Sequence, residues 1–147
     1  MKRQPEGGFL IGKIHRLSHR ILTRKLKDYQ INLINPAQGR IMFVVWRKDG
    51  LSISDLARET SLGKSTLTSM LDRLEKAGHL KRVPSQDDRR KLLIRRTRKD
   101  RAAEETYKAV SKKMTKLFYS GFSKHEIGQF EGYLQKILAN LTASDLH

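Results

Sequence analysis

Two short amphipathic segments joined by a tight turn, with two alternating segments after them, constrain the fold of this chain more than any other feature. The first pair lies in "SISDLARETSLGKSTLTSMLDRLEKAGH", residues 52–79. Ser52 with Asp55 three residues on predicts the start of one helix, and Gly78 is suited to end the next in the left-handed conformation. The second helix carries its apolar side chains on one face: Leu67, Met70, Leu71 and Leu74. Two short helices joined by a turn have the outline of a helix-turn-helix.

A pair of predicted strands follows. "LKRV" and "KLLIRR" are separated by Pro84, Ser85, Gln86 and two aspartates, a pattern that indicates a hairpin with a long polar tip. A helix-turn-helix followed by a hairpin is the order of a winged helix. The predicted fold class is therefore mainly α with a small β-hairpin wing (α+β).

Another helix is predicted just before this region. At "NPAQ", Asn35 is suited to accept at the N-cap, Pro36 fits the first helical position, and Gln38 is placed to bond back to the cap. The apolar run "IMFVVW" that follows fits either a buried strand or a buried helix. The cap before it and "DG" after it favour a helix.

Long helices are predicted at both ends of the chain. The first runs from Phe9 to about Gln30, with apolar side chains at steps of three and four: Leu10, Ile14, Leu17 and Ile21. Thr97 is suited to cap a helix whose apolar side chains lie close to a heptad seam: Ala103, Tyr107, Val110, Met114 and Leu117. Ser123 with Glu126 predicts the start of the last helix, whose apolar stripe is Ile127, Phe130, Leu134, Ile137 and Leu141. Because a heptad seam favours a helical partner, we expect these ends to assemble with another chain.

The balance of charged residues favours a polyanionic partner. The chain has 31 Lys and Arg against 15 Asp and Glu, a net charge of +16, which favours nucleic acid ahead of an anionic membrane. It has no cysteine, which excludes disulfides, thiolate metal sites and thiol redox switches. No apolar run approaches the roughly 18 residues of a membrane span, and the first residues lack a signal-peptide core, so we expect a cytoplasmic protein.

The stretch "SISDLARETSLGKSTLTSMLDRLEKAGHLKRVPSQDDRRKLLIRRT", residues 52–97, resembles the winged helix of the MarR (multiple antibiotic resistance regulator) family. The most specific parts are "ST.T..LDRLE..G" and "DRR" followed later by Thr97, and the order of the flanking helices is also similar. The resemblance implies a homodimer with interlocked end helices that reads a palindromic operator in double-stranded DNA. It further implies a repressor released by a small-molecule effector, with no cofactor. The implied organisation is one domain over 1–147, with a winged-helix DNA-binding region at 36–97 and dimerisation helices at 9–32 and 98–142.

The residues themselves also support DNA binding. On the second helix of the predicted helix-turn-helix, small polar and basic side chains lie away from the apolar stripe: Lys64, Ser65, Thr68, Ser69 and Arg73. Such side chains suit a helix whose N-terminal half enters a major groove. The alternative for this helix alone is an ordinary solvated face, which the preceding helix, the hairpin and the basic charge make less probable.

The hairpin carries much of the positive charge. Between residues 81 and 101 there are ten basic and three acidic residues, a density suited to the phosphate backbone. At the tip, "DRR" places Asp88, Arg89 and Arg90 together, and in an extended segment residues two apart share a face, so Asp88 is expected to orient Arg90 toward a minor groove. The resemblance adds that the family's wing has this Asp-x-Arg arrangement. The alternative is a loop whose charges serve solubility.

Two positions depart from the family pattern. Arg96 stands where the family commonly has Leu before the threonine, and Asp100 replaces a glycine that often follows. The sequence leaves open whether Arg96 pairs with an acidic side chain or contacts DNA.

Other chemistry is weakly represented. His15 and His19 have metal-ligand spacing on one helix face, but no Cys or acidic cluster lies near them in sequence, so no metal site is predicted. With Arg16 and Arg20 they are candidates for an effector site. No nucleophile motif or phosphate-binding glycine loop is present, so an enzyme is not expected. The alternative function is a winged-helix module that binds RNA or coats DNA without sequence preference.

Overall fold

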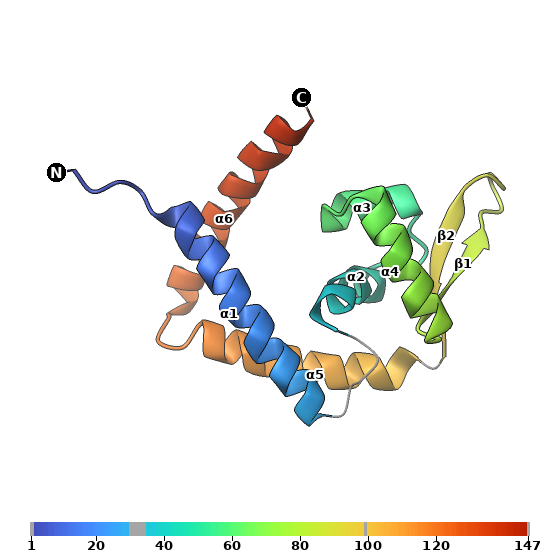
Figure 1. Cartoon of the computed structure of the whole chain (residues 1–147), viewed down its shortest axis with the longest axis horizontal. Coiled ribbons are helices and arrows are strands. Elements are labelled where there is room, and N and C mark those ends of the chain that lie inside the picture. The colour runs from blue at the N-terminus through green and yellow to red at the C-terminus, as the bar shows by residue number, and fades with distance from the viewer. Residues whose placement is uncertain (1, 30–34, 99, 147) are drawn as a thin grey trace. The chain divides into compact units, whose positions relative to one another are not determined.

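The computed structural model describes residues 2–29, 35–98 and 100–146, and within these ranges it contains six helices and one two-stranded hairpin (Figure 1). This agrees with the predicted fold class. The elements are α1 Gly7–Asp28, α2 Pro36–Arg47, α3 Ile53–Thr60, α4 Lys64–Lys76, β1 Leu80–Pro84, β2 Leu92–Arg96, α5 Asp100–Phe118 and α6 Lys124–Asp145. The predicted first helix extended to about Gln30 and the predicted dimerisation ranges include 30–32 and 99, all of which lie outside the described residues.

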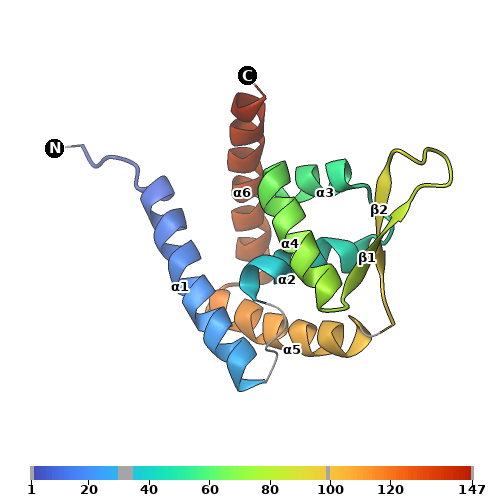
Figure 2. The same cartoon turned by 45° about the vertical axis from the view of Figure 1, so that its right-hand side comes forward.

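The chain divides into two compact units, Met1–Lys112 and Lys113–His147, and the boundary falls inside α5. The first unit contains the whole region from α2 to β2, in which α2, α3 and α4 group beside the hairpin in both views (Figures 1 and 2). None of the described helices is both long and apolar enough to cross a membrane.

Side-chain caps fix where α2 and α3 begin. Asn35 accepts a hydrogen bond from the backbone N–H of Gln38 at 2.8 Å, and the Gln38 side chain accepts from the Asn35 N–H at 3.1 Å. This reciprocal cap confirms the predicted start of α2 and the helical reading of "IMFVVW". Ser52 accepts from the Asp55 N–H at 3.1 Å, so the hydroxyl half of the predicted capping box is present at α3.

The core of the first unit is built from the apolar faces that the periodicity predicted. Leu67, Leu71 and Leu74 of α4 are completely buried, and they belong to a core cluster that draws side chains from every other element of the unit. The other core residues are Leu26, Ile41, Met42, Val45, Leu56, Leu80, Ile94, Tyr107 and Val110. Burial of a Leu or Ile side chain stabilises by about 1.5–3 kcal/mol, so this core is the main support of the helix-turn-helix.

The hairpin is antiparallel and pairs Leu80 with Arg96 at its base and Pro84 with Leu92 toward its tip. Gly78, with φ of +87°, turns the chain from α4 into β1, as predicted. The expected role of Thr97 as a helix cap is wrong, because its hydroxyl donates to the carbonyl of Gly78 and α5 begins three residues later. Thr97 thereby ties the two ends of the hairpin together.

The end helices differ from this core. α6 buries none of its side chains, although Ser123 and Glu126 form the predicted capping box at its start. Large apolar side chains remain exposed on α1 and on α6: Phe9, Leu10, Ile11, Ile14, Leu17, Tyr133, Ile137, Leu138 and Leu141. Exposed apolar surface on this scale is typical of an assembly interface.

Candidate nucleic-acid interface

The solvent-facing side of α4 carries the predicted contact residues. Leu67, Leu71 and Leu74 turn inward, and the predicted contact residues are all exposed on the helix: Lys64, Ser65, Thr68, Ser69 and Arg73. Ser and Thr hydroxyls both donate and accept hydrogen bonds, so this surface suits the mixed donors and acceptors of base edges.

The first turn of α4 is open to an anion. Its N-cap is Gly63, which has no side chain to bond the first backbone N–H groups, and the turn contains no acidic residue. Ser61, in the left-handed conformation with φ of 57°, ends α3 and allows the short connection to α4. The N–H groups of this turn, which receive no side-chain cap, and the positive end of the helix dipole therefore add to the charge of Lys64. Lys64 was predicted from the sequence, but the absence of a side-chain cap was not. Gly63 was the signal for it, because glycine has no side chain to cap the helix.

An arginine clamp holds α4 to the hairpin. The Arg82 guanidinium donates to Glu75 Oε2 from Nη2 at 2.6 Å and from Nε at 2.9 Å, and Nη2 lies 2.6 Å from Asp72 Oδ1. These hydrogen bonds lower the pKa of Glu75, first through the Arg82 side chain and then through its backbone N–H. From the sequence, Arg82 was predicted only to contribute to the positive charge of the hairpin. The structure shows that it joins β1 to α4.

The tip of the hairpin brings Asp88 and Arg90 together, as predicted. Arg90 Nε donates to Asp88 Oδ1 at 3.3 Å, and the Arg90 backbone N–H donates to the same oxygen at 3.0 Å. The reason given from sequence was wrong, because the pair forms in a turn closed by the Lys91 N–H and the Asp88 carbonyl, 2.9 Å apart, and not in an extended segment. The Arg90 side chain is 92% exposed, and Arg89 beside it is also exposed.

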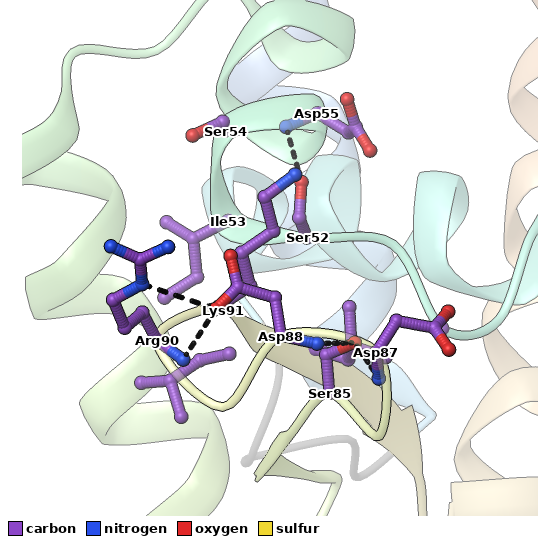
Figure 3. Close-up of a pocket in the computed structure, with 12 residues that line it drawn as sticks. Ser52, Ile53, Ser54, Asp55, Ser85, Asp87, Asp88, Arg90 and Lys91 are labelled. Atoms are coloured by element: carbon purple, nitrogen blue, oxygen red, sulfur yellow. Dashed lines mark hydrogen bonds and ion pairs between the residues drawn. The ribbon is translucent and has the colours of Figure 1, made fainter.

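Ser85 organises this tip. Its hydroxyl accepts from the backbone N–H groups of Asp87 at 3.2 Å and Asp88 at 3.4 Å, and its own N–H donates to the Lys91 carbonyl at 2.8 Å (Figure 3). A hollow of about 580 Å³ lies between the tip and the start of α3, lined on the α3 side by Ser52 and Asp55. The tip is therefore held by its own hydrogen bonds and leaves space beneath it.

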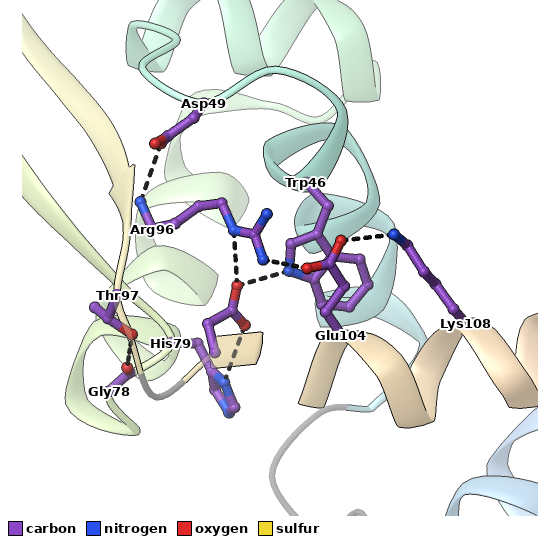
Figure 4. A network of polar contacts seen from close by, with 9 residues as sticks. Trp46, Asp49, Gly78, His79, Arg96, Thr97, Glu104 and Lys108 are labelled. Carbon is purple, nitrogen blue, oxygen red and sulfur yellow. Dashed lines mark hydrogen bonds and ion pairs between the residues drawn. The ribbon is translucent and has the colours of Figure 1, made fainter. Parts of the chain in front are cut away.

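A second polar cluster lies at the opposite end of the hairpin, and it answers the question left open for Arg96 (Figure 4). Arg96 pairs with two acidic side chains of α5: its Nε donates to Asp100 Oδ2 at 3.2 Å, and its Nη2 donates to Glu104. The indole N–H of Trp46 also donates to Asp100 Oδ2, at 2.7 Å. The two departures from the family pattern are thus partners of each other.

The cluster is strongly electrostatic. Burial lowers the pKa of Arg96, but hydrogen bonds and charges from Glu104 and Asp100 outweigh it and raise that pKa above its ordinary value. Hydrogen bonding from Lys108, and then from Arg96, holds the pKa of Glu104 below its usual range, against the effect of burial. The buried His79 ring lies with Nδ1 3.5 Å from Asp100 Oδ1.

The four effector candidates lie together on α1. His15, Arg16, His19 and Arg20 are exposed and line a shallow hollow of about 540 Å³, with the two imidazole rings 6.4 Å apart between centroids. All four come from one helix. Across the described parts of the chain, no group of three or more acidic or His side chains could hold a metal ion.

Comparison with known proteins gives consistent results. Residues 34–92 match the model of the MarR family. The chain is 30% identical over 101 residues to the transcriptional activatory protein BadR of Rhodopseudomonas palustris, covering 66% of this chain and 56% of BadR. It is 29% identical over 126 residues to the organic hydroperoxide resistance transcriptional regulator of Bacillus subtilis, covering 84% of each.

Solved structures give the same picture. A mutant MarR from E. coli in complex with operator DNA is similar with a TM-score of 0.77 and 25% sequence identity, covering 89% of this chain and 92% of that one. The chain spans little more than half the length of BadR, so the activity of the whole of BadR is not carried over to it.

Proposed function

Because the chain belongs to the MarR family, whose members are transcriptional regulators and not enzymes, we propose that it regulates transcription by binding DNA. In this proposal it binds a palindromic operator in double-stranded DNA as a homodimer. It represses transcription until a small-molecule effector releases it. The observation that carries the proposal is the exposed polar face of α4 clamped by Arg82 to a hairpin that presents an exposed Arg90.

The α4 helix reads the major groove in this proposal. Ser65, Thr68 and Ser69 contact base edges, while Lys64 and the open first turn contact phosphate. Arg73 follows on the same exposed side and extends the phosphate contact. The buried leucines support the assignment because they leave only this side of the helix available to a ligand.

The hairpin tip reads the minor groove. A planar guanidinium with five donors fits the narrow groove. The hydrogen bond that Arg90 Nε donates to Asp88 Oδ1, beside the one from the Arg90 backbone N–H to the same oxygen, limits the orientations that the guanidinium samples before binding. Arg89 is available to the adjoining phosphates. If a dimer neutralises about eight phosphates, log affinity falls against log salt with a slope of roughly 7.

A second copy of the chain is the partner for the exposed apolar faces of α1 and α6. α6 has no buried side chain, and exposed residues on it include Tyr133, Leu138 and Leu141. Two copies related by a twofold axis would read half-sites about 10 bp apart, one turn of DNA. Light scattering should give a dimer mass at micromolar concentration. A folded monomer by circular dichroism at that concentration would contradict the assembly.

The effector is proposed to act near His15, Arg16, His19 and Arg20, whose cationic and aromatic groups suit a small aromatic acid. Loss of operator binding on addition of such acids is the expected result. Cationic drugs serve as the comparison set, because the two arginines should repel them.

Selection of binding sites from random DNA duplexes tests the proposal. A palindromic consensus is expected for the wild type, with altered base preferences for Ser65→Ala, Thr68→Ala and Ser69→Ala. Lys64→Ala should weaken all sequences alike, as a phosphate contact does. Enrichment of DNA without a motif, or of RNA in a parallel selection, would favour the alternative of a winged-helix module without sequence preference.

A further inference from the structure

Three elements of the first unit converge on one buried carboxylate. Asp100, at the start of α5, has no exposed surface, accepts from Trp46 of α2 and from Arg96 of β2, and faces His79 in the turn before β1 (Figure 4). Glu104, one turn further along α5, accepts from Nη2 of the same Arg96 guanidinium. The end of the hairpin and the first two turns of α5 are thus fixed to each other by charge.

This arrangement is not the simplest way to stabilise the junction. A buried ion pair often contributes no more than apolar side chains of similar volume, because desolvation of both charges offsets their attraction. The cluster is also incompletely bonded: among the residues that the structure describes, both ring nitrogens of His79 and Oδ1 of Asp100 are buried without a hydrogen-bond partner. Stability alone therefore does not explain this cluster, because desolvation and unbonded polar atoms offset its attraction. The direction in which it holds β2 and the start of α5 explains it better.

The cluster lies where the hairpin meets the start of α5, so it acts on the angle between these two elements. α5 begins in the first unit, beside the hairpin, and continues past Lys112 into the second. Whatever fixes the first turns of α5 to β2 therefore fixes the angle between these turns and the hairpin. Under the proposed function, α5 leads toward the dimer contact, so this angle sets the distance between the two recognition helices.

We propose that Asp100 and Arg96 are positioning residues that determine which half-site spacing the dimer accepts. The inference rests on the proposed function, because it needs a dimer that reads two half-sites. Neither residue contacts DNA in this scheme. Their effect is on discrimination between spacings and not on recognition of a single half-site.

The experiment measures affinity for a series of operators whose half-sites are moved one or two base pairs closer together or further apart, and for a duplex with one half-site. The principal variant is Asp100→Asn. Its amide oxygen still accepts from Trp46, and its amide nitrogen takes the place of the oxygen that faces His79 Nδ1, so it should fold while Arg96 loses a charged partner. We expect the ratio between the best and the neighbouring spacing to fall roughly 2- to 30-fold, the scale on which mutations alter coupling between sites.

Two further variants separate positioning from general loosening. Glu75→Gln removes a carboxylate from an arginine clamp of matching geometry that joins the hairpin to α4 and not to α5. It should leave the spacing ratio unchanged. Arg96→Leu/Asp100→Ala removes both charges, which should preserve folding, and it should still flatten the spacing profile.

The outcomes are distinguishable. A wild type with no preferred spacing contradicts the proposed function itself. A wild type with a preferred spacing, together with an unchanged ratio in folded Asp100→Asn, overturns the inference. So does an equal loss of discrimination in Glu75→Gln. Should Asp100→Asn fail to fold, the double variant decides in its place, and a wild-type ratio there also overturns the inference. Affinity for the single half-site should stay within about twofold of wild type in folded Asp100→Asn and in the double variant, the scatter expected of changes away from the contact surface.

Discussion

The base and the tip of the hairpin each carry an aspartate–arginine pair, and the surroundings of the two pairs are opposite. At the base, Asp100 is fully buried and Arg96 is held by two carboxylates. At the tip, Asp88 holds Arg90 by contacts of 3.0 and 3.3 Å, and the arginine is 92% exposed. The same two side-chain types therefore fix structure at one end and present charge at the other. Burial decides which role a pair takes, because removing a partner is costly only where water cannot replace it.

The largest expected effect follows from removing the buried carboxylate. Asp100→Ala leaves the Trp46 N–H without an acceptor and Arg96 with Glu104 alone, so it should lower the free energy of unfolding by about 3 kcal/mol, the lower end for a broken buried pair. Urea denaturation measures this. Arg96→Leu/Asp100→Ala should recover part of the loss, because it also removes the half-buried guanidinium that has lost Asp100, while Glu104 keeps its contact with Lys108. If Asp100→Ala lowers the free energy of unfolding by less than about 1 kcal/mol, the buried pair at the base is no more stabilising than an exposed pair such as the one at the tip.

A smaller effect, on binding and not on stability, is expected at the tip. Arg90→Ala and Asp88→Ala should each weaken specific DNA binding by about 1–3 kcal/mol, while the stability changes stay within about 0.5 kcal/mol. The double variant should lose less than the sum, because either change breaks the same arrangement. Arg90→Lys should recover only part of the loss, since an ammonium lacks the planar fork.

The control for these tip variants is Gln86→Ala, an exposed change in the same loop, which should bind as wild type does. Ser85 is unsuitable because its hydroxyl accepts from two backbone N–H groups of the tip. Strictly additive losses would show that Asp88 and Arg90 act separately. Wild-type affinity of Arg90→Ala at physiological salt would show that the tip makes no specific contact through Arg90 and is only a charged loop.

The contrast between base and tip also shows what could be predicted from sequence. The helices, the hairpin and the exposed face of α4 follow from periodicity and capping residues, which act over three or four neighbours along the chain. The Asp88–Arg90 pair was predicted because its members are two residues apart. The reason was wrong, since a turn and not an extended strand brings them together. The local pattern therefore predicted the correct pair of residues but the wrong backbone conformation between them.

The base could not be predicted in the same way. Trp46 and Asp100 are 54 residues apart, and only the packing of α2 against β2 and α5 brings them within 2.7 Å. His79 gave no sign of being buried, because it directly follows a glycine that ends a helix, where side chains are commonly exposed. The one available signal was that Arg96 and Asp100 both depart from the family pattern, four residues apart. Two departures at that spacing indicate a pair.

The smallest expected effect is a pH dependence of the base, carried by Glu104. Its pKa is lowered in the folded protein, by Lys108 first and then by Arg96, from an ordinary value of 4.5. A lowered carboxyl pKa contributes stability that is fully present above 4.5 and is lost as the pH falls through the folded-state value. Glu104→Gln removes this contribution, so the variant should be less stable than wild type by about 1 kcal/mol or less at neutral pH, the scale of a partly exposed ion pair.

The gap between the two proteins should then narrow as the pH falls below 4.5, because protonated Glu104 no longer attracts Arg96 or Lys108. Urea denaturation at several pH values measures this gap. The rising positive charge of the whole chain affects both proteins equally and cancels in the difference. Glu105→Gln, an exposed change at the next position of α5, is the matched control and should stay close to wild type throughout. A gap that stays constant on acidification would mean that Glu104 stabilises the base through packing and not through its charge.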